Sequence, residues 1–258
     1  LRCRSRVQSL PKLSGRLGEN VRTNSENLQG AGSRNKDIDY SKGIAITSII
    51  NTREDTNVEP VRFSDGSSLI RNITAPLVDG DTIPVRLLHT GLEILRHPVD
   101  FFYARFFSRW ARHTTILLFM RPVEEILRVR LGRNIFTLFR KGVMFDTQGG
   151  AKLPKGPEIC NRFTRQFAKK INGIPQASVM DSLLNFPITA HFMGGVPLGR
   201  DDREGVVDIN FQVHNYPGLF VVDSSIMPGN PGVNPSLTIT ALAEYAMSRI
   251  PQKTSEDK

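Results

Sequence analysis

The stretch PGLFVVDSSIMPGNPGVNPSLTITALAE, residues 217–244, decides the fold of the C-terminal part of the chain. Its continuous apolar run Leu219–Val222 has the pattern of a fully buried strand. A loop rich in glycine and proline follows. A helix is then predicted, because Asn234 is a good N-cap, Pro235 suits the first helical position and Pro251 marks the end. The stretch therefore predicts a strand, a loop and a helix in that order.

This strand-loop-helix unit has the chemistry of a ligand site. In open α/β folds ligands bind beyond the carboxyl ends of strands, and a helix N-terminus offers free N–H groups and a partial positive charge. The alternative is that Gly232, Asn234 and Pro235 only form a tight turn and a cap. Asp223, at the strand end, faces the same two interpretations: it accepts hydrogen bonds from a ribityl or ribose hydroxyl, or it satisfies loop amides.

A second motif, HFMGGVPLG, occupies residues 191–199. His191 stands just before a Gly-Gly pair, where backbone can approach a ligand and an imidazole can act as a base near neutral pH. For any one histidine, however, an ordinary surface or core position is the competing interpretation. The chain has five: His89, His97, His113, His191 and His214.

The middle of the chain reads as a mixture of strands and helices. A β-rich region begins at Gly43, and Pro76 assigns the NITAPLV run to an edge or bulged strand. Aromatic residues at every fourth position predict an amphipathic helix over 99–112. Three strands of an antiparallel meander are predicted next, over residues 114–120, 125–131 and 134–140. A helix is then predicted over residues 157–170, and it ends at Asn172-Gly173.

The composition places the chain among folded globular proteins. Of its 258 residues, 39% are hydrophobic and 23% charged, which excludes collagen-like, coiled-coil and disordered classes. The formal net charge of +9 suits nucleic acid, an anionic membrane surface or a phosphorylated cofactor without choosing among them. Cys3 and Cys160 match neither a disulfide framework nor a metal-ligand spacing, so we expect unpaired thiols and no metal site.

No apolar run approaches the roughly 18 residues of a membrane span, and the N-terminus lacks the apolar core of a signal peptide. We therefore expect a soluble protein, cytoplasmic or peripheral to a membrane, with the compartment unknown. The first residue, Leu1, indicates a piece of a longer reading frame.

The segments HFMGGVPLG, GVVD and residues 217–244, in this order and spacing, closely resemble the C-terminal signature of the glucose-methanol-choline (GMC) oxidoreductases, most of all the bacterial cholesterol oxidase branch. The opening residues 1–26 resemble that branch more weakly, and residues 40–187 match only in length and texture. The resemblance implies a flavoenzyme that binds FAD and oxidises an alcohol by hydride transfer. A sterol or another hydrophobic secondary alcohol is the implied substrate, with a sugar or choline-like alcohol as an alternative.

The resemblance also implies roles for individual residues. His191 matches the active-site histidine, and Asn234 matches its partner beside substrate and flavin. Asp223 matches the acid that contacts the FAD chain. Backbone amides around Asn234 would face the flavin, which makes Gly232, Pro235 and Ser236 candidate cofactor-binding residues. These roles agree with a helix N-terminus stabilising reduced flavin and a base activating the carbinol.

The implied fold is α+β or α/β: a substrate-binding β-sheet with helices, plus the C-terminal part of an FAD-binding Rossmann-like domain. We expect residues 1–30 to be a residual segment of the FAD-binding domain, 31–187 to form the substrate-binding domain, and 188–258 to return to the FAD-binding domain. The dinucleotide fingerprint GxGxxG does not occur in the chain, so we expect the N-terminal FAD-binding segment to be missing.

Two further features leave alternatives open. Cholesterol oxidases use a carboxylate to move the steroid double bond; a rough alignment puts Ser68 there, with Glu59 and Asp65 as substitutes, so oxidation is favoured over isomerisation. Residues 86–141 hold eleven Arg or Lys and four acidic residues. Their aromatic helix either contacts an anionic membrane surface or packs on the sheet and lines an apolar pocket. No nucleic-acid motif is present. A non-catalytic lipid- or membrane-binding remnant is the alternative to an enzyme.

Overall fold

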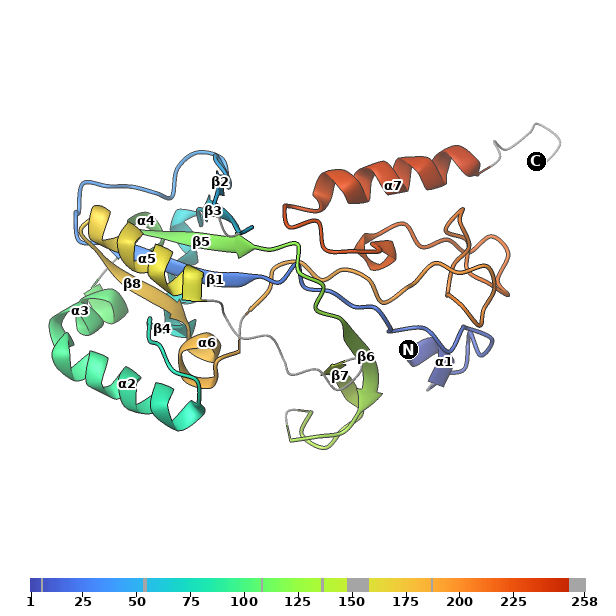
Figure 1. Ribbon diagram of the computed structural model, residues 1–258, viewed down its shortest axis with the longest axis horizontal. Coiled ribbons are helices and arrows are strands. Elements are labelled where there is room, and N and C mark those ends of the chain that lie inside the picture. Colours follow the sequence, from blue (N-terminus) through green and yellow to red (C-terminus); the bar gives the residue numbers. More distant parts are fainter. Residues whose placement is uncertain are drawn as a thin grey trace. The chain divides into compact units, whose positions relative to one another are not determined.

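The computed structural model describes residues 1–5, 7–52, 55–107, 109–135, 137–147, 158–186 and 188–250 (Figure 1). The chain divides into two compact units. The first unit comprises Leu1–Asn24, Val123–Lys152 and His191–Lys258, and the second comprises Ser25–Pro122 and Leu153–Ala190. Residues 123–152, which the sequence placed in the middle segment, cluster with the two terminal segments. The functional assignment of the three segments stays a prediction.

The second unit is built on an antiparallel sheet of six strands in the order β2-β3-β5-β1-β8-β4. The strands are β1 (Asn27–Ser33), β2 (Ile50–Asn51), β3 (Asn57–Val61), β4 (Thr74–Pro76), β5 (Thr114–Met120) and β8 (Gly173–Ser178). Pro76 lies in β4 at the edge of the sheet, which confirms the edge-strand prediction, since proline cannot donate to a ladder on its free side.

Helices cover this sheet and its margins. They are η1 (Asp65–Ile73), α2 (Ile83–Arg96), α3 (Pro98–Phe102), η2 (Tyr103–Phe107), α4 (Trp110–His113), α5 (Glu158–Lys170) and α6 (Val179–Leu184). Helix α5, yellow in Figure 1, lies across one face of the sheet and confirms the helix predicted over 157–170. Asn172 has a φ of 49°, the left-handed conformation expected of the predicted stop.

The apolar core of the second unit lies between α5 and the sheet. Val58, Leu117, Phe119 and Cys160 are fully buried there. Ile159, Phe163 and Phe167 pack on them from α5 at intervals of four residues, the spacing that places side chains on one face of a helix. This burial raises the pKa of the Cys160 thiol to about 12, whereas Cys3 is exposed.

The predicted meander over 114–140 is wrong in two respects. β5 is an inner strand of the six-stranded sheet, and β6 (Leu127–Gly132) pairs instead with β7 (Gly142–Thr147) in the first unit. The described part of residues 134–140 forms turns. Leu138 and Phe139 have φ values of 49° and 56°, which a strand excludes, and both side chains are exposed. Apolar alternation alone misassigned this segment.

The amphipathic helix predicted over 99–112 is divided into α3, η2 and α4. η2 is a π-helix, whose wider turn changes the angle between successive side chains. Trp110 consequently points inward and is fully buried, with its indole Nε1 donating to Gln176 Oε1 at 3.1 Å. Phe102 and Phe106 remain 52% and 61% exposed. The aromatic side chains therefore do not share one face.

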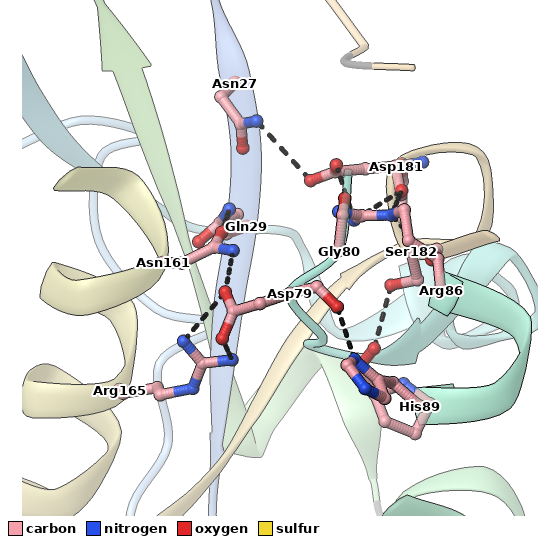
Figure 2. Close-up of polar contacts among 12 residues, drawn as sticks. Asn27, Gln29, Asp79, Gly80, Arg86, His89, Asn161, Arg165, Asp181 and Ser182 are labelled. Atoms are coloured by element: carbon pink, nitrogen blue, oxygen red, sulfur yellow. Dashed lines mark hydrogen bonds and ion pairs between the residues drawn. The ribbon is translucent and has the colours of Figure 1, made fainter. Parts of the chain in front are cut away.

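In the second unit, a buried polar network connects helix α2 with helix α6 and the loop at Gly80 (Figure 2). Arg86 and Asp181 form a buried ion pair at 3.3 Å, and the Arg86 guanidinium also donates to the backbone carbonyls of Gly80, Asp181 and Ser182. Burial raises the pKa of the Asp181 carboxyl, although Arg86 and Asn27 lie beside it and oppose the shift. Arg86 therefore fixes the loop at Gly80 and helix α6 to α2.

The first unit has a small core and little regular structure. Val196, Val206, Val207, Phe211, Val213, Ile226 and Ala246 are buried together. Ala246 belongs to α7 (Ser236–Arg249), and the described ranges of the unit also contain the short helices α1 (Arg2–Ser5) and η4 (Ser224–Ile226). Residues 219–222 are not the predicted buried strand: Leu219 is exposed, and among the described residues only an isolated bridge, Gln212 to Phe220, pairs the run. None of the helices in the described ranges is long and apolar enough to cross a bilayer.

Replacing Arg86 by Met should destabilise the fold severely. The change removes four backbone-directed hydrogen bonds and leaves the Asp181 carboxylate buried without its partner, so the free energy of unfolding should fall by about 3–5 kcal/mol. Arg96→Met, an exposed position on the same helix, is the matched control and should change it by about 0.5 kcal/mol or less. Urea unfolding measures both; equal midpoints for the two variants would contradict the structural role of Arg86.

The two thiols should differ sharply in reactivity, because the thiolate is the nucleophile and burial keeps Cys160 protonated. A thiol-specific chromogenic disulfide should label Cys3 rapidly in the native chain and Cys160 only after urea unfolding. Cys3→Ser should abolish the fast phase. Rapid labelling of both thiols in the native protein would show that the core beneath α5 is open.

Candidate active site

All six predicted site residues lie in the first unit: His191, Asp223, Gly232, Asn234, Pro235 and Ser236. They belong to three segments without long strands or helices, namely the loop after residue 190, the turn at 223–226 and the loop that enters α7. His191 and Asn234 are half-buried, and the Asp223 side chain is exposed. Contacts with other parts of the same unit determine where each segment lies.

The loop that carries His191 is held against residues 20–22. Met193 and Arg22 exchange backbone hydrogen bonds of 2.7 and 3.0 Å. Gly194 has a φ of 73°, and a Cβ there would lie 2.0 Å from the carbonyl oxygen of Asn20. The Gly-Gly pair was predicted to let a ligand approach, and in the structure it lets the backbone at Asn20 approach instead. Only glycine fits at residue 194.

The turn at Asp223 lies beside this loop. Gly194 N–H donates to the Ser224 carbonyl and Val196 N–H to the Ser225 carbonyl, each at 3.0 Å. Asp223 Oδ1 accepts from the backbone N–H of Ser225 at 2.8 Å and from its hydroxyl at 2.5 Å. Its second carboxylate oxygen, Oδ2, forms no hydrogen bond within the described part of the chain. Asp223 therefore satisfies a loop amide, one of the two interpretations of its role, and keeps one oxygen available.

Asn24 holds the loop that carries Asn234. Its side chain is 0% exposed. Asn24 N–H donates to Asn230 Oδ1 at 3.0 Å, its Nδ2 donates to the Val233 carbonyl at 2.9 Å, and its Oδ1 accepts from Gly232 N–H at 2.9 Å. The backbone of Asn24 is left-handed, with φ at 57°, a conformation that asparagine tolerates better than most residues. The position of the Gly232 loop thus depends on one buried amide.

Arg22 and Glu124 extend this contact. Arg22 Nε donates to Glu124 Oε2 at 2.6 Å, and Glu124 Oε1 accepts from the backbone N–H of Asn230 at 3.1 Å. Asn230 Nδ2 donates to the Val123 carbonyl at 2.5 Å. The segment 22–24 therefore contacts both the His191 loop and the loop that precedes Asn234. Local motif reasoning missed Arg22, Asn24 and Glu124; the weak resemblance of residues 1–26 was a signal for the first two, and Glu124 had none.

Helix α7 begins one residue later than predicted. It starts at Ser236 with Pro235, at φ −82° and ψ −8°, in the N-cap position, since the Pro235 carbonyl accepts the first bond of the helix. Asn234 is therefore not the N-cap, which corrects the sequence prediction. The first intrahelical bond runs from Ile239 N–H to the Pro235 carbonyl at 2.9 Å. The amides of residues 236–238 precede it and have no acceptor inside the helix.

An apolar cavity of about 330 Å³ lies in the same unit beside the His191 loop and the Asp223 turn. Its walls include Phe145 and Phe192, whose rings stack at 5.5 Å. Gly194, Gly195, Ser224 and Ser225 also line it. The cavity therefore presents aromatic and glycine surfaces next to two of the three predicted site segments.

The substitute carboxylates lie in the second unit. Glu59 is buried in β3. Asp65 is paired with Arg112 at 2.6 Å, and this hydrogen-bonded guanidinium lowers the pKa of the carboxyl. Ser68 Oγ accepts from Ala111 N–H at 3.5 Å. Another buried carboxylate of this unit, Glu26, accepts from the Thr189 hydroxyl at 2.8 Å and from Ala190 N–H at 2.5 Å, and so fixes the residues that precede His191 in sequence.

Comparisons with known proteins identify relatives. A cholesterol oxidase of Acinetobacter baumannii is 40% identical over 245 residues, which cover 95% of this chain and 44% of that protein. A cholesterol oxidase of Mycobacterium tuberculosis is 37% identical over 264 residues, covering 96% of this chain and 44% of the relative. A long-chain-alcohol oxidase of Arabidopsis thaliana is 31% identical over 86 residues, 33% of this chain and 12% of that protein.

The chain thus spans less than half the length of these curated relatives. The family model of the GMC oxidoreductases matches residues 146–243, which include His191, Asp223 and Asn234. The chain therefore contains a GMC oxidoreductase C-terminal domain at residues 146–243, and it is 37–40% identical to the two cholesterol oxidases over nearly all of its residues.

Proposed function

We propose that the chain forms the C-terminal part of an FAD-dependent oxidoreductase that oxidises a hydrophobic secondary alcohol, with a sterol as the expected substrate. One observation carries the proposal: the loops of His191 and Asn234 are both held by neighbouring residues of one segment, Arg22 and Asn24. Two polar side chains that must act on one hydroxyl need such a shared support. The similarity to cholesterol oxidases supports the sterol class.

The residues of the first unit fit a flavin nucleotide. The amides at the start of α7 are donors of the kind that flavin carbonyls accept, and the helix dipole there favours the negative charge of a reduced flavin. Asp223 Oδ2 is an acceptor for a sugar or ribityl hydroxyl. We assign the FAD contacts to Asp223, Gly232, Asn234, Pro235 and Ser236. When bound, FAD supplies the acceptor for the carbinol hydride.

The chain's own residues would orient and deprotonate the substrate hydroxyl group. Oxidation of a secondary alcohol to a ketone removes one proton from the oxygen and one hydride from the carbon. A ring nitrogen of His191 takes the proton, which makes the carbinol a better hydride donor. The Asn234 amide orients the hydroxyl by hydrogen bonding. The shared support at residues 22–24 keeps both groups in place, which lowers the entropic part of the barrier.

The proposal retains the functional division made from the sequence. Residues 31–187 bind the substrate, and residues 1–30 and 188–258 belong with the flavin. A non-catalytic lipid- or membrane-binding protein, and an oxidase of a long-chain alcohol, are the competing possibilities that an assay separates. Oxidation without isomerisation is the expected chemistry, because Asp65 is engaged by Arg112.

His191→Ala should abolish turnover without loss of flavin. In the flavin-loaded protein, loss of the base should lower kcat for cholesterol by about 10²–10⁴-fold while the visible flavin spectrum is retained. His89→Ala, an exposed histidine of the second unit, is the matched control and should leave kcat unchanged. Full turnover by the His191 variant would refute its role, and turnover of long-chain alcohols but not of sterols would reassign the substrate.

Asn24→Asp should loosen the loop before Asn234. The variant keeps the acceptor for Gly232 N–H but replaces the Nδ2 donor to Val233 with an oxygen, so one hydrogen bond becomes a repulsive contact. Amide exchange over residues 230–235 should accelerate about tenfold or more, which corresponds to the roughly 1.4 kcal/mol or more lost with a buried hydrogen bond. Asn35→Asp, the same change at an exposed position, should leave amide exchange over residues 230–235 unchanged. Equal exchange in both variants would contradict the role of Asn24.

A further inference from the structure

The second unit contains a cavity of about 600 Å³ whose lining includes none of the residues assigned above to the flavin or to the alcohol hydroxyl. It is formed by the helical segments α2, α3, η2 and α5 together with strands β4 and β8. Its lining includes Phe101, Ala104, Arg105, Lys169, Ile174 and Pro175. The volume lies within the range of small-molecule sites.

The interior surface of this cavity is largely apolar. Ala75, Pro76, Ile174 and Pro175 supply strand surface, and Phe101 supplies an aromatic wall. The Phe101 ring meets Phe102 edge-on at 5.7 Å, and Phe102 stacks on Phe106 at 5.9 Å. Since Phe102 and Phe106 are exposed, apolar surface continues from inside the cavity to solvent. This surface suits a long aliphatic or otherwise apolar ligand body.

The same cavity carries an excess of positive charge. Five arginine or lysine side chains line it, against the two carboxylates of Glu93 and Asp100. Asp100 is already paired with Arg34, so it does not neutralise the remaining cations. The lining therefore favours an anionic group on its ligand.

Two of the cations have no carboxylate partner within the described residues, Arg105 and Lys169. Arg105 Nη1 donates to the Arg71 carbonyl at 2.6 Å and is oriented by it, which leaves its other N–H groups for a ligand. Lys169 and Arg165 lie one turn apart on α5 and both face the cavity, with Arg165 paired to Asp79 at 2.8 Å. The lining thus contains a guanidinium and an ammonium that no carboxylate of the described residues neutralises.

The backbone at Arg105 is itself unusual. Ala104 and Arg105 belong to η2, a π-helix, and such helices are rare and concentrate at functional sites. Ala104, the residue before Arg105, also lines the cavity. Charge, apolar surface and backbone geometry therefore coincide at one place.

We propose that this cavity binds a long-chain carboxylate, with the chain on the apolar surface and the carboxylate at Arg105 and Lys169. A nucleotide or sugar phosphate would bury its polar body against Ile174, Pro175 and Phe101 without partners. An uncharged alcohol would leave the two cations unmatched. The inference does not depend on flavin binding, so it can be tested separately from the proposed oxidation.

The test measures palmitate binding to the purified full chain by calorimetry, with the fatty acid below its aggregation concentration. Lys169→Glu should weaken Kd about tenfold or more, the loss of one charge-assisted hydrogen bond. Lys170→Glu makes the same charge change at the next residue, outside the lining, and should leave Kd unchanged. Hexadecanol, which lacks the charge, should bind at least tenfold more weakly than palmitate to the native chain.

A second variant and a second ligand source complete the test. Ala104→Phe should fill the cavity and abolish palmitate binding, while thermal unfolding verifies that each variant is folded. Three results would overturn the proposal: no palmitate binding to the native chain, equal weakening by Lys169→Glu and Lys170→Glu, or binding only to vesicles of anionic phospholipid. The last would mean that the cations serve a membrane surface rather than a single bound carboxylate.

Discussion

A buried side-chain amide must have its hydrogen bonds satisfied, and the arrangement of the first unit follows from this constraint at Asn24. Both amide atoms and the backbone N–H of Asn24 are bonded to residues 230–233. Its left-handed backbone turns the chain directly before β1, the strand that lies between β5 and β8. Residue 24 therefore positions the loop into α7 within the first unit.

The two units solve the problem of polar residues differently. In the second, a compact apolar core under α5 coexists with a buried network in which Arg86 satisfies three backbone carbonyls and Asp181 (Figure 2). In the first unit, regular structure is sparse, and isolated hydrogen bonds between loops hold the segments together. Because loops are not restricted to helical or strand geometry, they can place His191, Asp223 and Asn234 in positions that regular elements do not offer. The positions of these loops then depend on a few hydrogen bonds.

The basic character of the chain has a local explanation in the second unit. Several arginines are engaged in ion pairs, as Arg34 is with Asp100 and Arg112 with Asp65. Arg105 and Lys169 instead border a cavity with apolar walls. A formal charge of +9 is therefore not spread evenly over solvated faces, and part of it lies where it can select a ligand.

The sequence by itself indicated the family resemblance and the candidate residues, and it determined the elements with strong periodicity, including α5, the strand at 114–120 and the edge position of Pro76. These features are local, since helical spacing, capping residues and proline act within a few positions of the chain. Periodicity failed where a local turn or a change of helix type interrupts the repeat, as at Leu138 and Phe139 with positive φ and in the division of the aromatic helix by η2. Only the tertiary structure decided that Asn24 and Arg22 support loops about 170 to 210 residues away in sequence, because a hydrogen bond between distant segments leaves no periodic signal in either one.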